Sequence, residues 1–359
     1  MERRETSEDL NNEPASGRCD DTGKLPALQC RRQRRSTDCL KPSNMAEAWS
    51  RFRDSGFSQS PQFTYDAPEQ HVREAFASVC VRHNLKVEAE EILKQHKSCG
   101  ESCHRDTERL SADQVRAEAE AYVSSLGLST HRVEVCLQSG LRAARVSRRK
   151  DSRGVFFMCS FPVEGTFRSR WRGILDHELG THLVRMVNDE DQVWHGDRAS
   201  FKLGDPDATE EGLATVNQCL TASCKLLFDP ALLYFSACRG AELGFCELFA
   251  ELRRHCNTLL SCWGYCCRVK CGLSDASLPG ATGHGQLYFQ GAVEVLRYVC
   301  RHESFNVSRL YGGRLSLGDS VRLPDHMFDD VYHPPFISSA EKLERYRAHC
   351  CEVLACNHL

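Results

Sequence analysis

His177-Glu178-Leu179-Gly180-Thr181-His182 is the stretch of sequence on which the fold and the chemistry of this chain depend. Apolar residues recur around it at helical spacing, so we predict a helix. Its two imidazoles and a nearby carboxylate are side chains that commonly bind zinc. Because the histidines are five residues apart, a regular helix at about 100° per residue would turn their rings about 140° apart. One extra residue in the turn, a π-bulge, would bring the rings together, and Gly180 makes this distortion sterically easier. The alternative is that both histidines are ordinary helix residues.

A third ligand is predicted on a second helix, which begins near Thr209-Glu210-Glu211-Gly212-Leu213-Ala214. Two histidines and a glutamate are a known ligand set of catalytic zinc. Glu211 heads a Glu-Gly-x-Ala string, which is the setting of the third ligand in gluzincin peptidases, so we favour it. Glu210 is the alternative, although a carboxylate in the first turn is also explained by the helix dipole. We therefore expect one Zn²⁺ held by His177, His182 and Glu211.

Glu178 is left free to act on a water molecule at this site. Zinc lowers the pKa of a bound water to about 7, so Glu178 can accept a proton as general base and return it to a leaving amine. The pattern predicts a metallopeptidase. Such an enzyme needs one more group that stabilises the oxyanion, and the candidates are Tyr288, Arg268 and His284. Packing in the core or at the surface is the alternative role of each.

Composition limits the classes of protein to which the chain can belong. It has 359 residues, of which 41% are hydrophobic and 26% charged, as in a globular protein. No apolar run is long enough for a membrane span, and residues 1–10 lack the apolar core of a secretion signal. We therefore expect the 21 cysteines to be reduced thiols in the cytoplasm. The net charge of -3 argues against a nucleic-acid partner.

The order of patterns along the chain predicts an α+β fold that is mostly helical, with a small β-sheet beside the active-site helix. We interpret it as a zincin- or gluzincin-like metallopeptidase domain. Residues 1–60 are rich in polar and charged residues and are expected to form a disordered arm. Its run Arg31-Arg32-Gln33-Arg34-Arg35 is either a solvated segment or a contact for an acidic surface. The expected domain comprises 61–130 (helical, with a capping box at Ser111 and Gln114), 131–165 (the sheet) and 166–359 (the helical metal-binding half).

Taken together, these residues resemble the family of microtubule-associated tyrosine carboxypeptidases, over roughly Phe63 to Leu359. The metal stretch and the Glu-Glu-Gly-Leu-Ala string are the most specific parts of the match. Shorter blocks keep the register between them: Asn188-Asp189, Trp194-His195, Pro230-Ala231-Leu232-Leu233-Tyr234, Tyr265-Cys266-Cys267-Arg268-Val269-Lys270, Gly272-Leu273-Ser274-Asp275, Pro279-Gly280, Gln286-Leu287-Tyr288 and Asn357-His358-Leu359.

The resemblance implies a zinc metallocarboxypeptidase that removes the C-terminal tyrosine of α-tubulin. It implies the α-tubulin tail and the microtubule lattice as partners and a place on the cytoplasmic microtubule cytoskeleton, and we expect a monomer. Carried over residue by residue, it gives the ligands His177, His182 and Glu211, with Glu178 as base.

A carboxypeptidase also needs a cation for the free α-carboxylate of its substrate. Arg268 and Lys270 lie in a matched block and are candidates, as is Tyr288 for substrate binding. The basic stretch Arg142 to Lys150 either binds an acidic tail or is a solvated hairpin. The chain departs from the family pattern at Cys271, Ala281-Thr282 and His284-Gly285, and we expect these changes to affect specificity more than zinc binding.

Two other functions are compatible with the sequence. One is a metallopeptidase that acts on another acidic protein tail. The other is a microtubule-binding protein without turnover. The complete ligand set together with Glu178 favours an enzyme, and replacement of Glu178 by glutamine would separate an enzyme from a pure binder.

Overall fold

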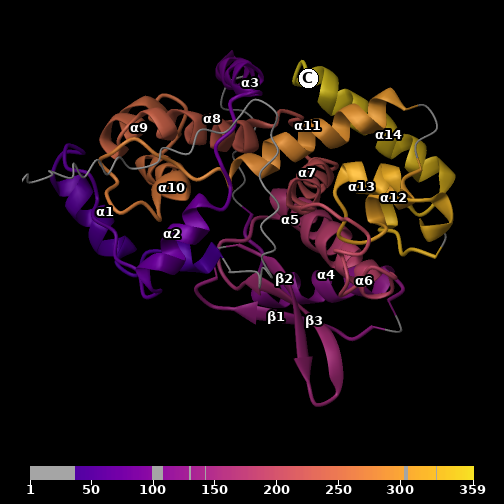
Figure 1. Ribbon diagram of the computed structural model, residues 1–359. Helices are drawn as coiled ribbons and strands as arrows, with labels where there is room; N and C mark the ends of the chain where they lie inside the picture. The colour runs from indigo at the N-terminus through magenta and orange to yellow at the C-terminus, as the bar shows by residue number, and fades with distance from the viewer. Residues whose placement is uncertain (1–36, 99–107, 129–130, 142, 303–305, 329) are drawn as a thin grey trace, which may run out of the picture. The chain divides into compact units, whose positions relative to one another are not determined.

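A three-stranded sheet lies beneath a larger set of helices in the computed structural model (Figure 1). The structure describes residues 37–98, 108–128, 131–141, 143–302, 306–328 and 330–359. The strands are β1 (Val133–Gln138), β2 (Arg145–Asp151) and β3 (Gly154–Pro162) in the order β1-β3-β2. β3 pairs in parallel with β1 and antiparallel with β2. The expected α+β fold, mostly helical with a small sheet, is confirmed.

Alternation of side chains explains which face of the sheet is covered. Val133 and Val135 of β1 lie opposite Phe157 and Cys159 of β3, so all four share one face. Phe157 and Cys159 are buried, and the two valines pack against the same hydrophobic cluster. β2 lies at the edge, and its turn to β3 forms the hairpin at the bottom of Figure 1.

Within the described residues, four α-helices precede the sheet: α1 (Met45–Asp54), α2 (Glu69–Ala77), α3 (Lys86–Ser98) and α4 (Ala112–Ser125). The capping box predicted for α4 is confirmed. The backbone N–H of Gln114 donates to the Ser111 hydroxyl at 3.2 Å, and the backbone N–H of Ser111 donates to the Gln114 side chain at 2.9 Å. These bonds satisfy two donors that a helix start leaves open.

The structure differs from the expectation that residues 1–60 form a disordered arm, because part of this segment is helical. Residues 1–36, with the arginine run, lie outside the described residues, but Met45–Asp54 forms α1. The helix is held by distant aromatic partners, because the ring of Phe52 lies 5.2 Å from that of Phe245 and 4.9 Å from that of Phe249. Local composition gave no sign of these contacts.

The helical half begins with one continuous helical segment: α5 (Arg168–His177), the π turn η3 (Glu178–Leu183) and α6 (Val184–Glu190). Helix α7 (Asp207–Gln218) packs on α5, and α11 (Gln286–Arg301) packs on α7. The other helices and 3-10 turns are α8 (Phe228–Glu242), α9 (Phe245–Leu252), α10 (Leu259–Lys270), α12 (Ser308–Tyr311), α13 (Leu317–Arg322), α14 (Ala340–Cys356), η1 (Thr37–Leu40), η4 (Asp325–Phe328) and η5 (Pro335–Ile337).

Two glycines bring α7 and α11 into backbone contact. A Cβ atom added to Gly291 of α11 would lie 1.7 Å from the carbonyl oxygen of Ala208 on α7. One added to Gly212 would lie 2.0 Å from the carbonyl carbon of Gly291. The two helices can therefore be this close only because both positions lack a side chain. The crossing places the residue that precedes Gly212, Glu211, beside the first turns of α11.

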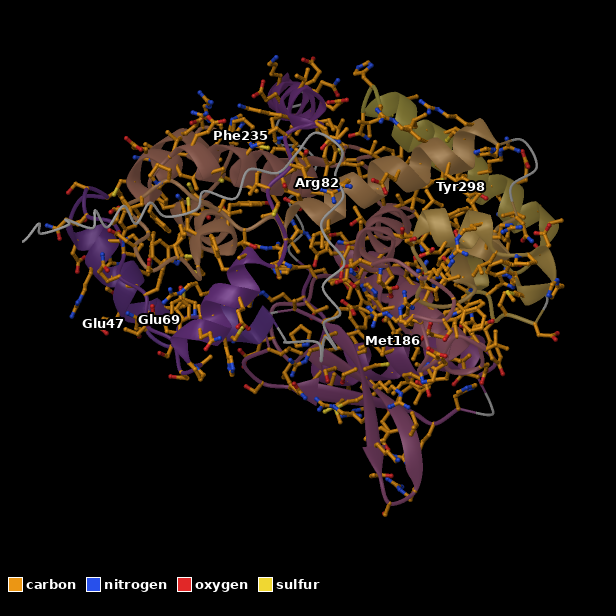
Figure 2. All side chains as sticks on the ribbon, in the orientation of Figure 1. Glu47, Glu69, Arg82, Met186, Phe235 and Tyr298 are labelled. Atoms are coloured by element: carbon orange, nitrogen blue, oxygen red, sulfur yellow. The ribbon has the colours of Figure 1, made fainter. Side chains whose placement is uncertain are left out.

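Side chains fill the space between these elements (Figure 2). Met186 on α6 and Tyr298 on α11 lie at the right of that view, whereas Glu47 on α1 and Glu69 on α2 lie at the left. The largest hydrophobic cluster extends from α1 to α14 and includes the inner face of the sheet. Of the helices that the structure describes, none combines the length and the apolar character that crossing a membrane requires.

Candidate metal centre

The helix that carries both histidines contains the predicted distortion. Residues Glu178–Leu183 form a π turn, and the ring centroids of His177 and His182 are 4.9 Å apart. The π-bulge predicted from the spacing is confirmed. Gly180 has a second reason to be glycine: a Cβ there would lie 2.5 Å from the Tyr122 hydroxyl and 2.9 Å from the ring of Phe336.

Three of the predicted residues converge at one point. One donor atom from each of His177, His182 and Glu211 lies within 4.8 Å of the others. All three side chains are half-buried, so solvent can reach the site. Nε2 of His182 is 3.8 Å from a carboxylate oxygen of Glu211. The structure thus assembles from α5, η3 and α7 the donor set of two imidazoles and one carboxylate.

These residues fit a zinc ion on chemical grounds. Imidazole nitrogen and carboxylate oxygen are its usual ligands in catalytic sites. Nδ1 of His177 is buried and makes no hydrogen bond of good geometry to a described residue, although Gln218 and Ala214 lie next to the ring. Burial lowers the pKa of His177 to about 3, so its imidazole is neutral, as a ligand must be. Burial lowers the pKa of His182, but Glu211 and Glu210 outweigh it and raise that pKa to about 9, so this ring carries a proton at neutral pH that a bound metal ion would have to displace.

Glu210, the alternative ligand, points to the other nitrogen of His182. Nδ1 of His182 donates to one carboxylate oxygen at 3.0 Å, and Nε of Arg185 donates to the other at 2.9 Å. Burial raises the pKa of Glu210, but the charges of Arg185 and Arg314 outweigh it and hold that pKa below its ordinary value. Glu210 is therefore an anion that fixes the ring of His182 and leaves Nε2 directed at Glu211.

Glu178 lies beside the three donors. Burial raises its pKa to about 7, while the neighbouring His182 lowers it. A carboxyl group with such a pKa exchanges protons readily at neutral pH, which is what a general base and acid requires.

Two of the predicted substrate residues, Tyr288 and Arg268, adjoin this group. The phenol of Tyr288 is within hydrogen-bonding reach of the Glu211 carboxylate, whose charge raises the pKa of the phenol. The guanidinium of Arg268 is stacked over the Tyr288 ring, 5.5 Å from its centroid. Arg268 is exposed, and none of the ion pairs between described residues includes it. It is thus a free cation near the donors.

Lys270 is not brought to the site, which corrects its assignment as a substrate residue. Its side chain is fully buried, and Nζ donates to the carbonyl oxygens of Gly240 and Leu278, each at 2.8 Å, and of Leu243. Burial lowers its pKa to about 8. Lys270 satisfies two carbonyls at the end of α8 and one in the segment between α10 and α11, so no donor remains for a ligand.

The oxyanion candidate His284 is also used elsewhere. Its Nε2 lies 2.9 Å from the Ser78 hydroxyl and 3.1 Å from the carbonyl oxygen of Ala75, at the end of α2. This departure from the family pattern therefore packs against α2 and not against the three donors. Of the oxyanion candidates, Tyr288 and Arg268 remain.

The basic stretch forms the edge strand β2, apart from Arg142, which lies outside the described residues. Arg145, Arg148, Arg149 and Lys150 are exposed, and Arg148 pairs with Glu190 at the end of α6. No ion pair joins Arg149 or Lys150 to a residue in the described ranges.

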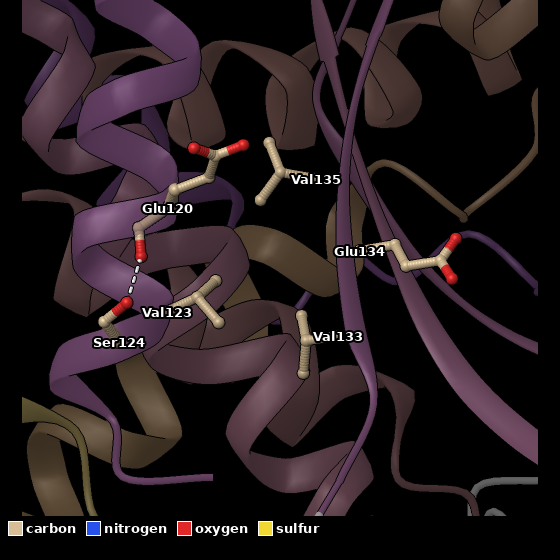
Figure 3. A pocket seen from close by; sticks show the side chains of 6 residues that line it. All are labelled: Glu120, Val123, Ser124, Val133, Glu134 and Val135. Atoms are coloured by element: carbon tan, nitrogen blue, oxygen red, sulfur yellow. Dashed lines mark hydrogen bonds between the residues drawn. The ribbon is translucent and has the colours of Figure 1, made fainter. Parts of the chain in front are cut away.

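A separate hollow lies between α4 and β1 and has a volume of about 500 Å³. Glu120, Val123 and Ser124 face Val133 and Val135 across it, while the carboxylate of Glu134 points away (Figure 3). None of the predicted site residues lines this hollow.

Known proteins resemble the chain over most of its length. It is 30% identical to the microtubule-associated tyrosine carboxypeptidase 1 of Homo sapiens over an alignment of 331 residues, which covers 89% of this chain and 68% of the relative. The protein of the same name from Mus musculus is 28% identical over 327 residues, again 89% of this chain and 68% of the relative. The putative tyrosine carboxypeptidase MATCAP2 of Homo sapiens is 27% identical over 318 residues, 85% of this chain and 51% of the relative. No protein-family model matches the chain.

Proposed function

Because the chain belongs to the family of microtubule-associated tyrosine carboxypeptidases, we propose that it is a zinc-dependent carboxypeptidase that removes the C-terminal tyrosine of α-tubulin. The observation that carries the proposal is the convergence of His177, His182 and Glu211 within 4.8 Å, with Glu178 beside them. The names of the relatives support a terminal tyrosine as the residue removed and the microtubule as the partner. The donor set supports a metal ion as the cofactor.

In this proposal the three converging residues hold one Zn²⁺, which when bound supplies Lewis acidity to a water and to the scissile carbonyl. Glu178 accepts the proton of the attacking water at its carboxylate and delivers it to the leaving amine. Glu210 holds the ring of His182 in place. The phenol of Tyr288, which lies next to Glu211, donates to the developing oxyanion.

Arg268 is the group that we assign to the α-carboxylate of the substrate. It carries a permanent charge and five N–H donors that suit a carboxylate. Its stacking on Tyr288 fixes it near the donors. Recognition of a free carboxylate beside the metal would restrict cleavage to the last residue of a chain.

We further propose that residues 61–359 are a zincin-like metallopeptidase domain to which α1 is attached, and that the protein acts on cytoplasmic microtubules. The exposed cations of β2 support an acidic tail as substrate, because the strand contacts η3 and its charges would attract acidic side chains.

The decisive experiment is to incubate the purified chain with microtubules and to follow the terminal tyrosine of α-tubulin by mass spectrometry. We expect loss of this residue, no loss after treatment with a chelator, and recovery when Zn²⁺ is added back. Release of a different residue, or release that continues in metal-free protein, would refute the proposal.

Replacement of Arg268 with glutamine is expected to lower kcat/KM by about tenfold or more, because a charge-assisted contact to the substrate carboxylate is lost. The matched control is Arg253→Gln, since Arg253 is also exposed and stacked on an aromatic ring, 5.7 Å from the centroid of Phe57. The control should leave kcat/KM unchanged. Equal effects of the two changes would remove Arg268 from substrate binding.

A further inference from the structure

The π turn is closed by a side chain as well as by its backbone. The hydroxyl of Thr181, inside the turn, donates to the carbonyl oxygen of Asp176 at 2.9 Å. Asp176 directly precedes His177, so the bond spans five residues, the same span as the backbone bonds of a π-helix. Thr181 is fully buried, and the bond therefore competes with no solvent.

Asn217 of α7 connects this hydroxyl to two tyrosines. Its amide nitrogen donates to the Thr181 hydroxyl and to the Tyr311 hydroxyl, both at 2.8 Å. Its amide oxygen accepts from the Tyr346 hydroxyl at 3.0 Å. We call Thr181, Asn217, Tyr311 and Tyr346 the Asn217 network. All four side chains are buried, and they join η3, α7, α12 and α14.

The network couples the elements that supply the donors of the candidate metal centre. Asn217 lies on the same helix as Glu211, and Thr181 lies next to His182. The alternative to a π turn is a regular helix, in which a spacing of five residues turns the two rings about 140° apart. In such a helix His177 and His182 could not bind the same metal ion. Whatever stabilises the π turn against the regular helix therefore decides whether the donors converge.

We propose that the Asn217 network holds η3 in the π conformation and thereby sets the affinity of the site for zinc. The inference rests on the proposed function, because it takes the converging donors to be a zinc site. Its members are positioning residues, since none of them is among the converging donors. The Thr181 hydroxyl bonds to the carbonyl oxygen of Asp176 and so stabilises the π turn. This turn sets the directions of the His177 and His182 rings, and thereby the affinity for the metal.

Thr181→Val tests the proposal, because it removes the hydroxyl and keeps the branched shape. We expect the dissociation constant for Zn²⁺, measured by competition with a chromogenic chelator, to rise at least tenfold. The visible spectrum of the Co²⁺ form should change as well, because the ligand geometry changes. Thr181→Ser keeps the hydroxyl and should restore both readouts.

Thr166→Val is the matched control. Thr166 is also buried, and its hydroxyl has no hydrogen-bond partner among the described residues. The same substitution there should leave the zinc affinity and the Co²⁺ spectrum unchanged. Should Thr181→Val fold poorly, Tyr346→Phe removes one hydroxyl at the far end of the network, and we expect a rise of about two- to threefold in the dissociation constant.

The outcomes separate this inference from the proposed function. Wild-type affinity and an unchanged Co²⁺ spectrum in Thr181→Val and Tyr346→Phe would overturn the inference, even if both variants melted earlier, and would leave the zinc site standing. A wild-type protein that binds no Zn²⁺ would overturn both. Loss of affinity in Thr181→Val with rescue in Thr181→Ser would support the network.

Discussion

Replacement of Glu178 with glutamine is expected to lower the turnover of α-tubulin by about 10²- to 10⁴-fold while zinc stays bound. Glutamine has nearly the same shape but cannot accept the proton of a water molecule at neutral pH. The donors are three other residues, His177, His182 and Glu211, so the metal content should not change. Initial rates of tyrosine release and the zinc content of the purified variant are the two measurements.

Microtubule binding is the control for this variant. Glu178 is half-buried in the site, and its replacement should leave cosedimentation with microtubules at the wild-type level. A variant that keeps more than about a tenth of the wild-type rate would show that Glu178 is not the general base. Unchanged behaviour in every assay, together with an inactive wild type, would instead indicate a microtubule-binding protein without turnover.

The local part of this site could be predicted from sequence because it follows from helix geometry. A spacing of five residues from His177 to His182 is incompatible with a shared face on a regular helix, and the structure resolves this with a π turn. The capping box at Ser111 and the strands β1 and β3 were predictable for a similar reason, since each depends on residues within a few positions of one another. The choice of Glu211 rested on a short string of neighbours.

The parts that sequence reasoning missed depend on contacts between distant segments. Lys270 looked like a free cation, but its ammonium group is held by the carbonyls of Gly240 in α8 and of Leu278 between α10 and α11. Residues around Phe52 looked disordered because the segment 1–60, to which they belong, is rich in polar and charged residues. The aromatic rings that stabilise this helix lie far away in sequence, in α9. Glu210 looked like a possible ligand, and one local signal could have shown its role. Arg185 follows His182 by three residues, so both lie on one helical face and can share a carboxylate.

The Gly291→Ala variant is expected to lose about 3 kcal/mol or more of its free energy of unfolding, which urea denaturation followed by circular dichroism would measure. The added methyl group would lie 1.7 Å from the carbonyl oxygen of Ala208, and a backbone atom cannot rotate away as a side chain can. Helix α11 must therefore move from α7. Because Glu211 is on α7 and Tyr288 on α11, the contact between them should be lost, and turnover with it.

The same substitution at Gly264 separates this clash from the general effect of alanine in a helix. Gly264 lies in α10, and a Cβ there would meet no atom within 4 Å. Alanine favours helices over glycine, so Gly264→Ala should stabilise the protein by about 0.5–1 kcal/mol and leave turnover unchanged. Two variants of equal stability would contradict the backbone contact between α7 and α11. Tyr288 on α11 reaches the Glu211 carboxylate on α7 because glycines let the two helix backbones touch. Equal stability of the two variants would show that the helices do not need this close contact, and the position of Tyr288 would then have another cause.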